Sequence, residues 1–151
     1  MQLMPLPKRV LQCGRLSLDL SQPHVMGILN VTPDSFSDGG RHNEKDAAVA
    51  RALEMMAEGA TVIDIGGEST RPGASPVSVE EEIRRVVPVV EALSAYDVVL
   101  SIDTSQPELI RAAVAAGAHI WNDVRALTRP NALQTAAELN IPVIIMHMRG
   151  E

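Results

Sequence analysis

Short apolar runs alternate with longer amphipathic stretches along most of this chain of 151 residues. Between the runs, apolar side chains recur at the spacing of one helix face, as Val49, Leu53 and Met56 do. Strand and helix that alternate in this way predict a parallel sheet with right-handed crossover connections. The runs that we interpret as buried strands cover residues 24–30, 61–65, 98–103, 119–123 and 142–147.

Capping residues set the expected ends of the first two helices. Asn43 is the expected N-cap of the first helix, and Gly59 is its expected stop. Ser78 and Glu81 have the spacing of a capping box at the start of the second helix. Pro88 lies within that helix, which we expect it to bend without interrupting.

Local signals also predict the remaining elements. Pro107 opens a third helix that Gly117 ends, and residues 130–139 form a fourth. Alternating apolar residues on either side of Cys13 predict a short hairpin within residues 9–20. The segments 59–64 and 117–122 align position by position. Each has a helix stop, an apolar strand and a polar side chain at the end of the strand.

Polar side chains stand at or near the carboxyl end of every predicted strand. An open doubly wound sheet gathers its ligands at one switch point, whereas the strand ends of a (β/α)₈ barrel converge on one mouth. The first strand also lacks a G-x-G-x-x-G turn. The pattern therefore favours an α/β fold of the TIM-barrel type. The strand-end side chains are Asn30, Asp64, Asp103, Asn122 and His147.

The length allows only part of such a barrel. A full barrel needs ~250 residues, and this chain supplies about four and a half strand–helix units. We therefore expect the N-terminal part of a TIM barrel, with an extension and hairpin in residues 1–23 and the incomplete barrel in residues 24–151. The first and fifth strands would then expose unpaired edges and apolar surface, which favours aggregation or assembly with another chain.

Composition narrows the expected partners and location. The formal net charge of −6 weighs against nucleic acid and against an anionic membrane as a partner. No apolar run approaches the ~20 residues of a membrane helix, and no signal-peptide core follows the first residues. The single cysteine, Cys13, leaves no internal disulfide and is interpreted as a packing residue. We therefore expect a cytoplasmic protein.

Two loops rich in turn-forming residues follow the first two strands. The first loop, residues 30–40, contains Phe36, whose apolar ring needs a cover that is either a substrate or a neighbouring loop. The second loop, residues 66–73, carries Arg71, which suits a phosphate or a carboxylate. The alternative for Arg71 is a surface ion pair with Glu68.

The strand ends offer groups that suit a neutral heterocycle. Asn30, Asp103 and Asn122 would present amide and carboxylate groups to ring N–H donors and ring acceptors. Alternatively, Asp103 caps the next helix and Asn122 is a turn residue. Asn30 and Asp34 are candidate oxygen ligands for Mg²⁺. His147 fits either acid–base chemistry or a structural hydrogen bond.

The segment MGILNVTPDSFSDGG, residues 26–40, resembles the first signature of bacterial dihydropteroate synthases. Residues 66–73 are similar to the second signature, and residues 101–104, 122–124 and 146–148 follow in the expected order. The similarity extends from about Leu16 to the end of the chain. It implies a pterin-binding (β/α)₈ barrel of folate biosynthesis. Such an enzyme joins p-aminobenzoate to 6-hydroxymethyl-7,8-dihydropterin diphosphate, with Mg²⁺, and releases pyrophosphate and 7,8-dihydropteroate.

The resemblance also implies roles on the pterin side of the site. Asp103 and Asn122 would hydrogen-bond the pterin ring, and Met146 would line its pocket. Asn30 would lie at the diphosphate and its Mg²⁺ ion.

On the other side of the site, the resemblance implies a p-aminobenzoate pocket in which sulfonamides inhibit the family. Asp34, in the first loop near the anion, and Arg71 are the expected catalytic residues. Pro33, Phe36 and Thr70 would shape the pocket together with Arg71.

Motifs from the second half of the family's barrel do not occur in this chain. They comprise a DFG-like strand with another pterin-binding Asp, a Lys-containing segment, and a late Arg/His pair. We therefore expect little or no turnover by this chain alone, and a homodimer for the complete enzyme. Two other interpretations are a non-catalytic pterin-binding or assembly half-barrel and a pterin-dependent methyltransferase domain. The two loops argue against the latter, because methyl transfer has no use for a p-aminobenzoate pocket.

Overall fold

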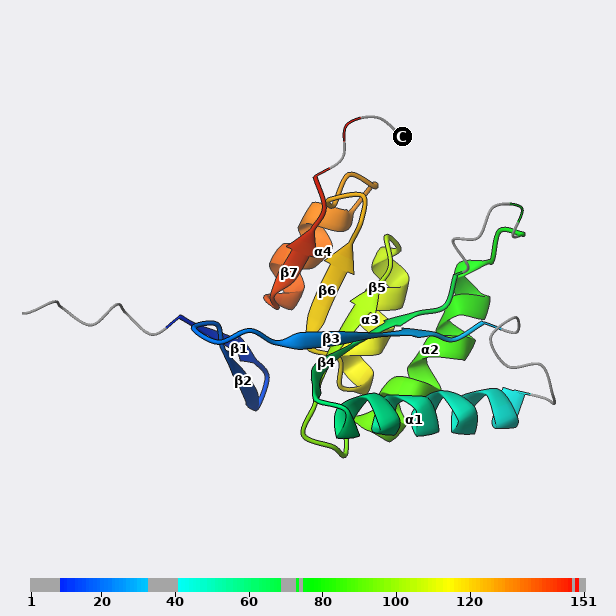
Figure 1. Ribbon diagram of the computed structural model, residues 1–151. Coiled ribbons are helices and arrows are strands. Elements are labelled where there is room, and N and C mark those ends of the chain that lie inside the picture. Colours follow the sequence, from blue (N-terminus) through cyan, green and yellow to red (C-terminus); the bar gives the residue numbers. More distant parts are fainter. Residues whose placement is uncertain (1–8, 33–40, 69–72, 74, 148, 150–151) are drawn as a thin grey trace, which may run out of the picture.

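The computed structural model describes residues 9–32, 41–68, 73, 75–147 and 149. Within these ranges the main element is a five-stranded parallel sheet in the order β3-β4-β5-β6-β7, so each strand pairs with the next along the chain (Figure 1). This order confirms the predicted alternation of strand and helix. The strands are β3 (Val25–Asn30), β4 (Ala60–Gly66), β5 (Val99–Asp103), β6 (Ile120–Asp123) and β7 (Val143–Ile145).

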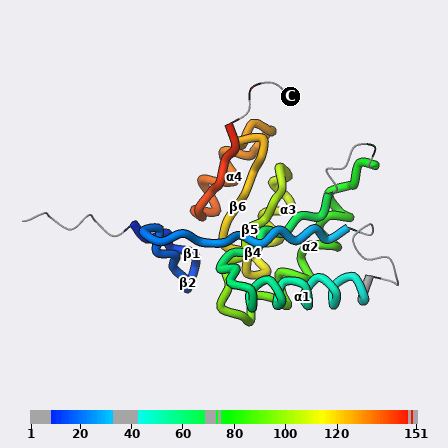
Figure 2. Tube along the Cα trace, in the orientation of Figure 1, coloured from blue at the N-terminus to red at the C-terminus, as the bar shows by residue number. Residues whose placement is uncertain are grey.

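In the described part of the chain, four helices form a row against one face of the sheet (Figure 2). Each helix packs on its neighbour along the chain, as expected for crossovers of the same hand. Among the described residues, no helix is long and apolar enough to cross a bilayer. The helices are α1 (Arg41–Ala57), α2 (Val79–Leu93), α3 (Pro107–Ala116) and α4 (Ala132–Leu139).

Several predicted boundaries are confirmed and others are wrong. The Ser78 side chain accepts a hydrogen bond from the Glu81 backbone N–H, and α2 continues through Pro88. However, Asn43 is not an N-cap, because α1 already begins at Arg41. The fourth helix begins at Ala132 instead of residue 130, because Asn131 takes a left-handed conformation with φ 66°. The last strand ends at Ile145, two residues earlier than expected.

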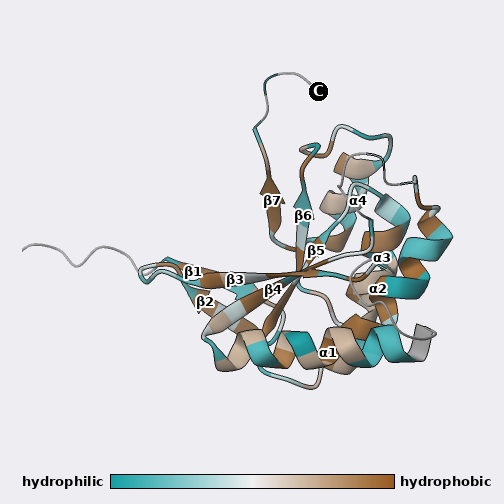
Figure 3. Ribbon diagram, turned by 45° about the vertical axis from the view of Figure 1, so that its right-hand side comes forward, coloured by the Kyte–Doolittle hydropathy of each residue, from teal (hydrophilic) through white to brown (hydrophobic). Residues whose placement is uncertain are grey.

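The face of the sheet toward the helices is the main hydrophobic core. Alternate residues of β4 and β5 point into it, as Ile63, Ile65, Leu100 and Ile102 do, and all four are fully buried. Trp121 of β6 joins them and is also fully buried. Colouring by hydropathy shows the strands as mainly hydrophobic, except for the hydrophilic end of β6 (Figure 3).

The opposite face of the sheet is covered at its amino end by a hairpin. β1 (Val10–Cys13) pairs with β2 (Leu16–Asp19) in antiparallel fashion, which confirms the predicted hairpin. Cys13 and Leu18 pack there against Val62, Val99 and Ile120, so Cys13 is a packing residue as expected. The amino ends of the strands are therefore closed by apolar side chains, and polar chemistry is left to the carboxyl ends.

The sheet has β3 and β7 as its two edges, as predicted for the first part of a barrel. Apolar side chains on these edge strands are exposed, among them Ile28 at 60% and Ile145 at 61%. An open parallel sheet normally covers such positions with further strands or helices. The architecture matches the N-terminal part of a TIM barrel.

Candidate functional site

The carboxyl ends of three strands, β3, β5 and β6, bring polar side chains into one row on the face opposite the helices. Strand register pairs Asn30 with Gly66, Gly66 with Asp103, and Asp103 with Asn122. Paired residues of neighbouring parallel strands point to the same side of a sheet and lie about 5 Å apart. Asn30, Asp103 and Asn122 therefore share one face, with Gly66 leaving space between the first two. This is the mouth predicted from the strand ends.

A buried carboxylate supports this row from the layer below. Asp64, only 4% exposed, accepts hydrogen bonds from the Ser101 hydroxyl at 2.7 Å and from the Asn122 amide nitrogen at 3.2 and 3.3 Å. Burial raises the pKa of Asp64, and the two hydrogen bonds oppose that rise. Since the Asn122 nitrogen donates downward, its amide oxygen is the group presented to the mouth.

Asp103 differs from Asp64 in having no hydrogen-bond partner among the described residues. It does not cap α3, because Thr104 Oγ1 accepts the backbone N–H of Gln106 instead. Burial raises the pKa of Asp103 to about 6, and the charges of Asp64, Asp123 and Glu68 add to the rise. An acceptor of this kind, partly buried and unpaired, is suited to a ligand that brings its own N–H donors.

The turn that follows β6 is organised by Asp123 rather than by Asn122. Asp123 is fully buried and accepts the Ser105 hydroxyl at 2.6 Å and the backbone N–H groups of Arg125 and Leu127, both at 2.9 Å. The alternative role of Asn122 as a turn residue is therefore wrong. Its neighbour holds the turn, and Asn122 itself is free to face the mouth.

A cavity of about 260 Å³ lies beside Asp103, between the loops that follow β4, β5 and β6. It contains a residue that sequence reasoning missed, Glu82, which is only 3% exposed. Glu82 is one of three consecutive glutamates at the start of α2, and all three suit a helix N-terminus, so local sequence does not single it out. The residues that line the cavity are Glu68, Glu82, Asp103, Thr104, Ser105, Val124 and Arg125.

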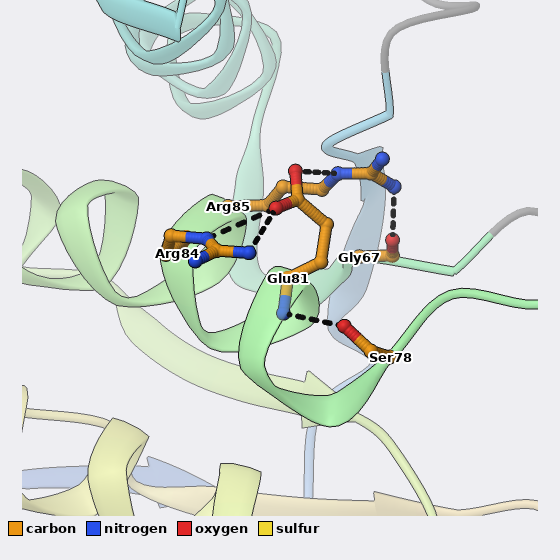
Figure 4. Close-up of polar contacts among 5 residues, drawn as sticks. All are labelled: Gly67, Ser78, Glu81, Arg84 and Arg85. Carbon is orange, nitrogen blue, oxygen red and sulfur yellow. Dashed lines mark hydrogen bonds and ion pairs between the residues drawn. The ribbon is translucent and has the colours of Figure 1, made fainter.

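The second glycine-rich loop is attached to α2 where it leaves β4 (Figure 4). The Arg85 guanidinium donates to the Gly67 carbonyl at 3.0 Å and to Glu81 at 3.3 Å. A Cβ atom at Gly67 would lie 3.0 Å from Val86, so the backbone approaches the helix as closely as glycine permits. The first residues of this loop are thus held against α2 by both packing and hydrogen bonds.

Several predicted site residues lie outside the described residues, namely Pro33, Asp34, Phe36, Thr70 and Arg71. Of the others, Asn30 is exposed at the mouth, and Met146 follows β7 with 48% of its surface exposed. His147 is exposed as well. In the described ranges, no group of three His, Cys, Asp or Glu side chains is placed to hold a metal ion.

A family model for pterin-binding enzymes matches residues 26–151, which include the mouth and all of the parallel sheet except Val25. The chain belongs to the pterin-binding enzyme family. The matched residues include Asn30, Asp103 and Asn122. The part of the chain that places it in this family is therefore also the part that forms the mouth.

Members of this family that resemble the chain are dihydropteroate synthases. The chain is 63% identical to dihydropteroate synthase of Escherichia coli (strain K12) over 135 residues, which are 89% of the chain and 48% of that protein. It matches a Xanthomonas albilineans dihydropteroate synthase structure with 4-aminobenzoic acid at 58% identity and a TM-score of 0.89, covering 95% of this chain and 53% of that one. A Yersinia pestis dihydropteroate synthase in complex with a sulfonamide drug matches at 58% identity and a TM-score of 0.84, covering 95% and 52%. The chain thus spans about half the length of these pterin-binding relatives.

Proposed function

We propose that this chain supplies the N-terminal half of a dihydropteroate synthase site. The complete enzyme would join p-aminobenzoate to 6-hydroxymethyl-7,8-dihydropterin diphosphate. The amine nitrogen bonds to the pterin methylene carbon, the bond from that carbon to the diphosphate oxygen breaks, and the amine loses a proton. The observation that carries the proposal is the pair of acceptors at the mouth, Asp103 and Asn122, in a chain 63% identical to a dihydropteroate synthase.

The pterin ring is the substrate portion that this half of the site recognises. The ring offers N–H and NH₂ donors along one edge, which suit the Asp103 carboxylate and the Asn122 amide oxygen. Asp64 fixes the orientation of the Asn122 amide, so its oxygen is presented before the ligand arrives. Met146 would pack against the flat ring.

Mg²⁺ is the metal that the proposed substrate implies. Asn30 is the described residue that could hold this ion, because it is exposed at the carboxyl end of β3 and its side chain makes no hydrogen bond with another described residue. A neutral amide oxygen at a mouth suits Mg²⁺, which takes few protein ligands and completes its shell with phosphate oxygens and water. Asn30 fits this role, and Mg²⁺ would stabilise the charge of the diphosphate.

The remaining roles belong to residues outside the described ranges. Asp34 and Arg71 are proposed to act at the reacting centre, near the anion that departs. Pro33, Phe36 and Thr70 would form the p-aminobenzoate pocket with Arg71, and sulfonamides would compete there. Exclusion of water from this region matters, because water would otherwise capture the developing cation at the methylene carbon. We further propose that the complete enzyme is a cytoplasmic homodimer.

The experiment that tests this function completes the barrel. Residues 1–147 would be joined in frame to the remaining half of the Escherichia coli relative, and formation of 7,8-dihydropteroate would be measured with both substrates and Mg²⁺. We expect activity from the chimera, little or none from the chain alone, and a large loss in the Asp103→Asn chimera. A folded chimera that binds no pterin and forms no product would overturn the proposal.

A further inference from the structure

Glu82 is a buried carboxyl that has no partner among the residues that the structure describes. It faces the sheet on the buried stripe of α2 that also contains Val86, Val89 and Leu93. Its side chain makes no hydrogen bond or ion pair with any described residue, although only 3% of the residue is exposed. A buried polar group without a partner normally costs about 1–3 kcal/mol, and an apolar side chain at this position would avoid that cost.

Glu82 lines the same cavity as Asp103. Among the described residues, no side-chain nitrogen or oxygen is both fully enclosed and unpaired. Since Glu82 has no partner in the described part of the chain, its oxygens are not fully enclosed, and the cavity of about 260 Å³ that Glu82 lines gives access to them. The cavity therefore places an unpartnered carboxyl next to the acceptor that we assign to the pterin ring.

The charges around Glu82 favour its neutral form. Burial is the largest cause that raises the pKa of Glu82 from 4.5 to about 7, and the negative charge of Glu68, after β4, is the next. The positive charges of Arg129 and Arg85 oppose this rise. The charge of Asp103, at the end of β5, adds to it. Arg125 also lines the cavity. The pKa of Asp103 is raised only to about 6. As the pH falls, Glu82 therefore takes up its proton before Asp103 does, and the remaining negative charge stays on Asp103.

We propose that Glu82 is a positioning residue of the pterin site, which takes up a proton when a ligand covers the cavity and so leaves Asp103 as the anionic acceptor. A bound ring removes water from the cavity, and this further disfavours a charged Glu82 carboxyl. The ring N–H donors meanwhile stabilise the Asp103 anion. The pterin identity of the ligand rests on the proposed function; the coupling between the two carboxyls does not.

Proton uptake has a defined effect on affinity. If binding takes up a proton at Glu82, affinity falls as the pH rises above about 7, because the free protein must then be protonated before it binds. A Glu82→Gln variant has no proton to take up, so its affinity should not change with pH in that range. A residue with only a structural role would alter affinity equally at all pH values.

Calorimetric titration with 6-hydroxymethylpterin tests this inference. The full chain, or its barrel-completed chimera if the chain alone binds no pterin, would be measured at pH 7.5 in two buffers of different ionisation enthalpy, which gives the number of protons taken up. We expect uptake in the wild type and in the exposed Glu91→Gln control, and none in Glu82→Gln. Equal uptake in the wild type and Glu82→Gln, or no uptake in the wild type, would overturn the inference.

A second measurement keeps the inference separate from the proposed function. Carboxyl ¹³C NMR of the ligand-free protein should show Glu82 titrating near pH 7, and at lower pH in Asp103→Asn, since the charge of Asp103 then no longer raises the pKa of Glu82. If Glu82→Gln does not fold, Glu82→Met serves in its place. Failure of every form to bind pterin would count against the proposed function, whereas an ordinary Glu82 titration would count against the coupling.

Discussion

The amide nitrogen of Asn122 on β6 reaches across β5 and donates to the Asp64 carboxylate on β4, at 3.2 and 3.3 Å from its two oxygens. The two residues are equivalent positions of the repeated segments 59–64 and 117–122. Asp64 lies one layer deeper and is almost fully buried, so it acts as the support for Asn122, which is only half-buried. A buried carboxylate below the mouth thus decides which atom of Asn122 faces the mouth.

Asp64→Ala should destabilise the protein by about 1–3 kcal/mol, because it leaves the Ser101 hydroxyl and the Asn122 amide without their buried acceptor. Urea unfolding would measure this loss. Pterin affinity of the completed barrel should also fall, because the Asn122 amide is then free to rotate. Ser101→Ala is the control, since it removes a single donor and should cost less. If Asp64→Ala weakened stability but left pterin affinity unchanged, the orienting role would be wrong.

The strand-end residues were predictable from sequence because a parallel sheet dictates where they meet. Once the runs around Asn30, Asp103 and Asn122 are assigned to neighbouring strands, their carboxyl ends must share one edge. The bond from Asn122 to Asp64 was not predictable, since it depends on a side chain that spans an intervening strand. Sequence spacing carries no signal for such a diagonal contact.

Glu82 was missed for a different reason. It is adjacent to two other glutamates in the first turn of α2, where negative charge is favourable at a helix N-terminus. Only its phase relative to Val86 and Leu93 places it on the inner side of the helix. Helix periodicity contained this signal, but a charged residue on an apolar stripe is usually assigned to the edge of the stripe. The left-handed backbone angles of Asn131 could not be predicted from the sequence either, and for this reason α4 begins later than expected.

Glu82→Met should stabilise the protein at pH 8 by about 2 kcal/mol and much less at pH 5. The pKa of Glu82 in the folded protein, about 7, lies above its ordinary value of 4.5. The contribution of the neutral Glu82 side chain to folding stability is therefore fully present below pH 4.5 and is lost as the pH rises to about 7. Methionine has no proton to lose and fills the same stripe. Chemical unfolding at the two pH values measures the difference. Exposed Glu91→Met should change stability by less than about 0.5 kcal/mol at either pH.

The pterin affinity of the completed barrel should fall at acidic pH, and we assign this acid limb of the pH profile to protonation of Asp103. Its pKa of about 6 in the free protein falls when ring N–H donors stabilise the carboxylate, so binding below pH 6 must release a proton. Affinity should therefore decrease by up to about tenfold for each pH unit below 6. Asp103→Asn should bind weakly and lack this limb, as calorimetry from pH 4.5 to 8 would show. An acid limb that persists in Asp103→Asn would assign it to another group.

Phe36→Ala in the completed barrel should raise the KM for p-aminobenzoate more than the KM for the pterin substrate. An aromatic ring provides a large apolar contact area for a flat aryl ligand, and its loss is selective for the substrate that packs on it. Steady-state kinetics with each substrate varied in turn gives both constants. Equal increases in the two KM values would remove the role assigned to Phe36.

Arg85→Ala should destabilise the protein by about 1–3 kcal/mol, whereas Arg84→Ala should cost at most about 1 kcal/mol. Both side chains contact Glu81, but the Arg84 side chain is 54% exposed and that of Arg85 only 14% (Figure 4). Arg85 alone also donates to the Gly67 carbonyl, at 3.0 Å. Urea unfolding of both variants compares the two costs, and the ¹³C chemical shift of the Gly67 carbonyl should change only in Arg85→Ala, because that carbonyl accepts the Arg85 hydrogen bond. Arg85→Lys should restore part of the stability but not the wild-type carbonyl shift, because a single ammonium cannot bridge the carboxylate and the carbonyl in the same fixed geometry. Equal losses in the two alanine variants would mean that the Gly67 contact contributes nothing, and that packing against Val86 alone holds the start of this loop.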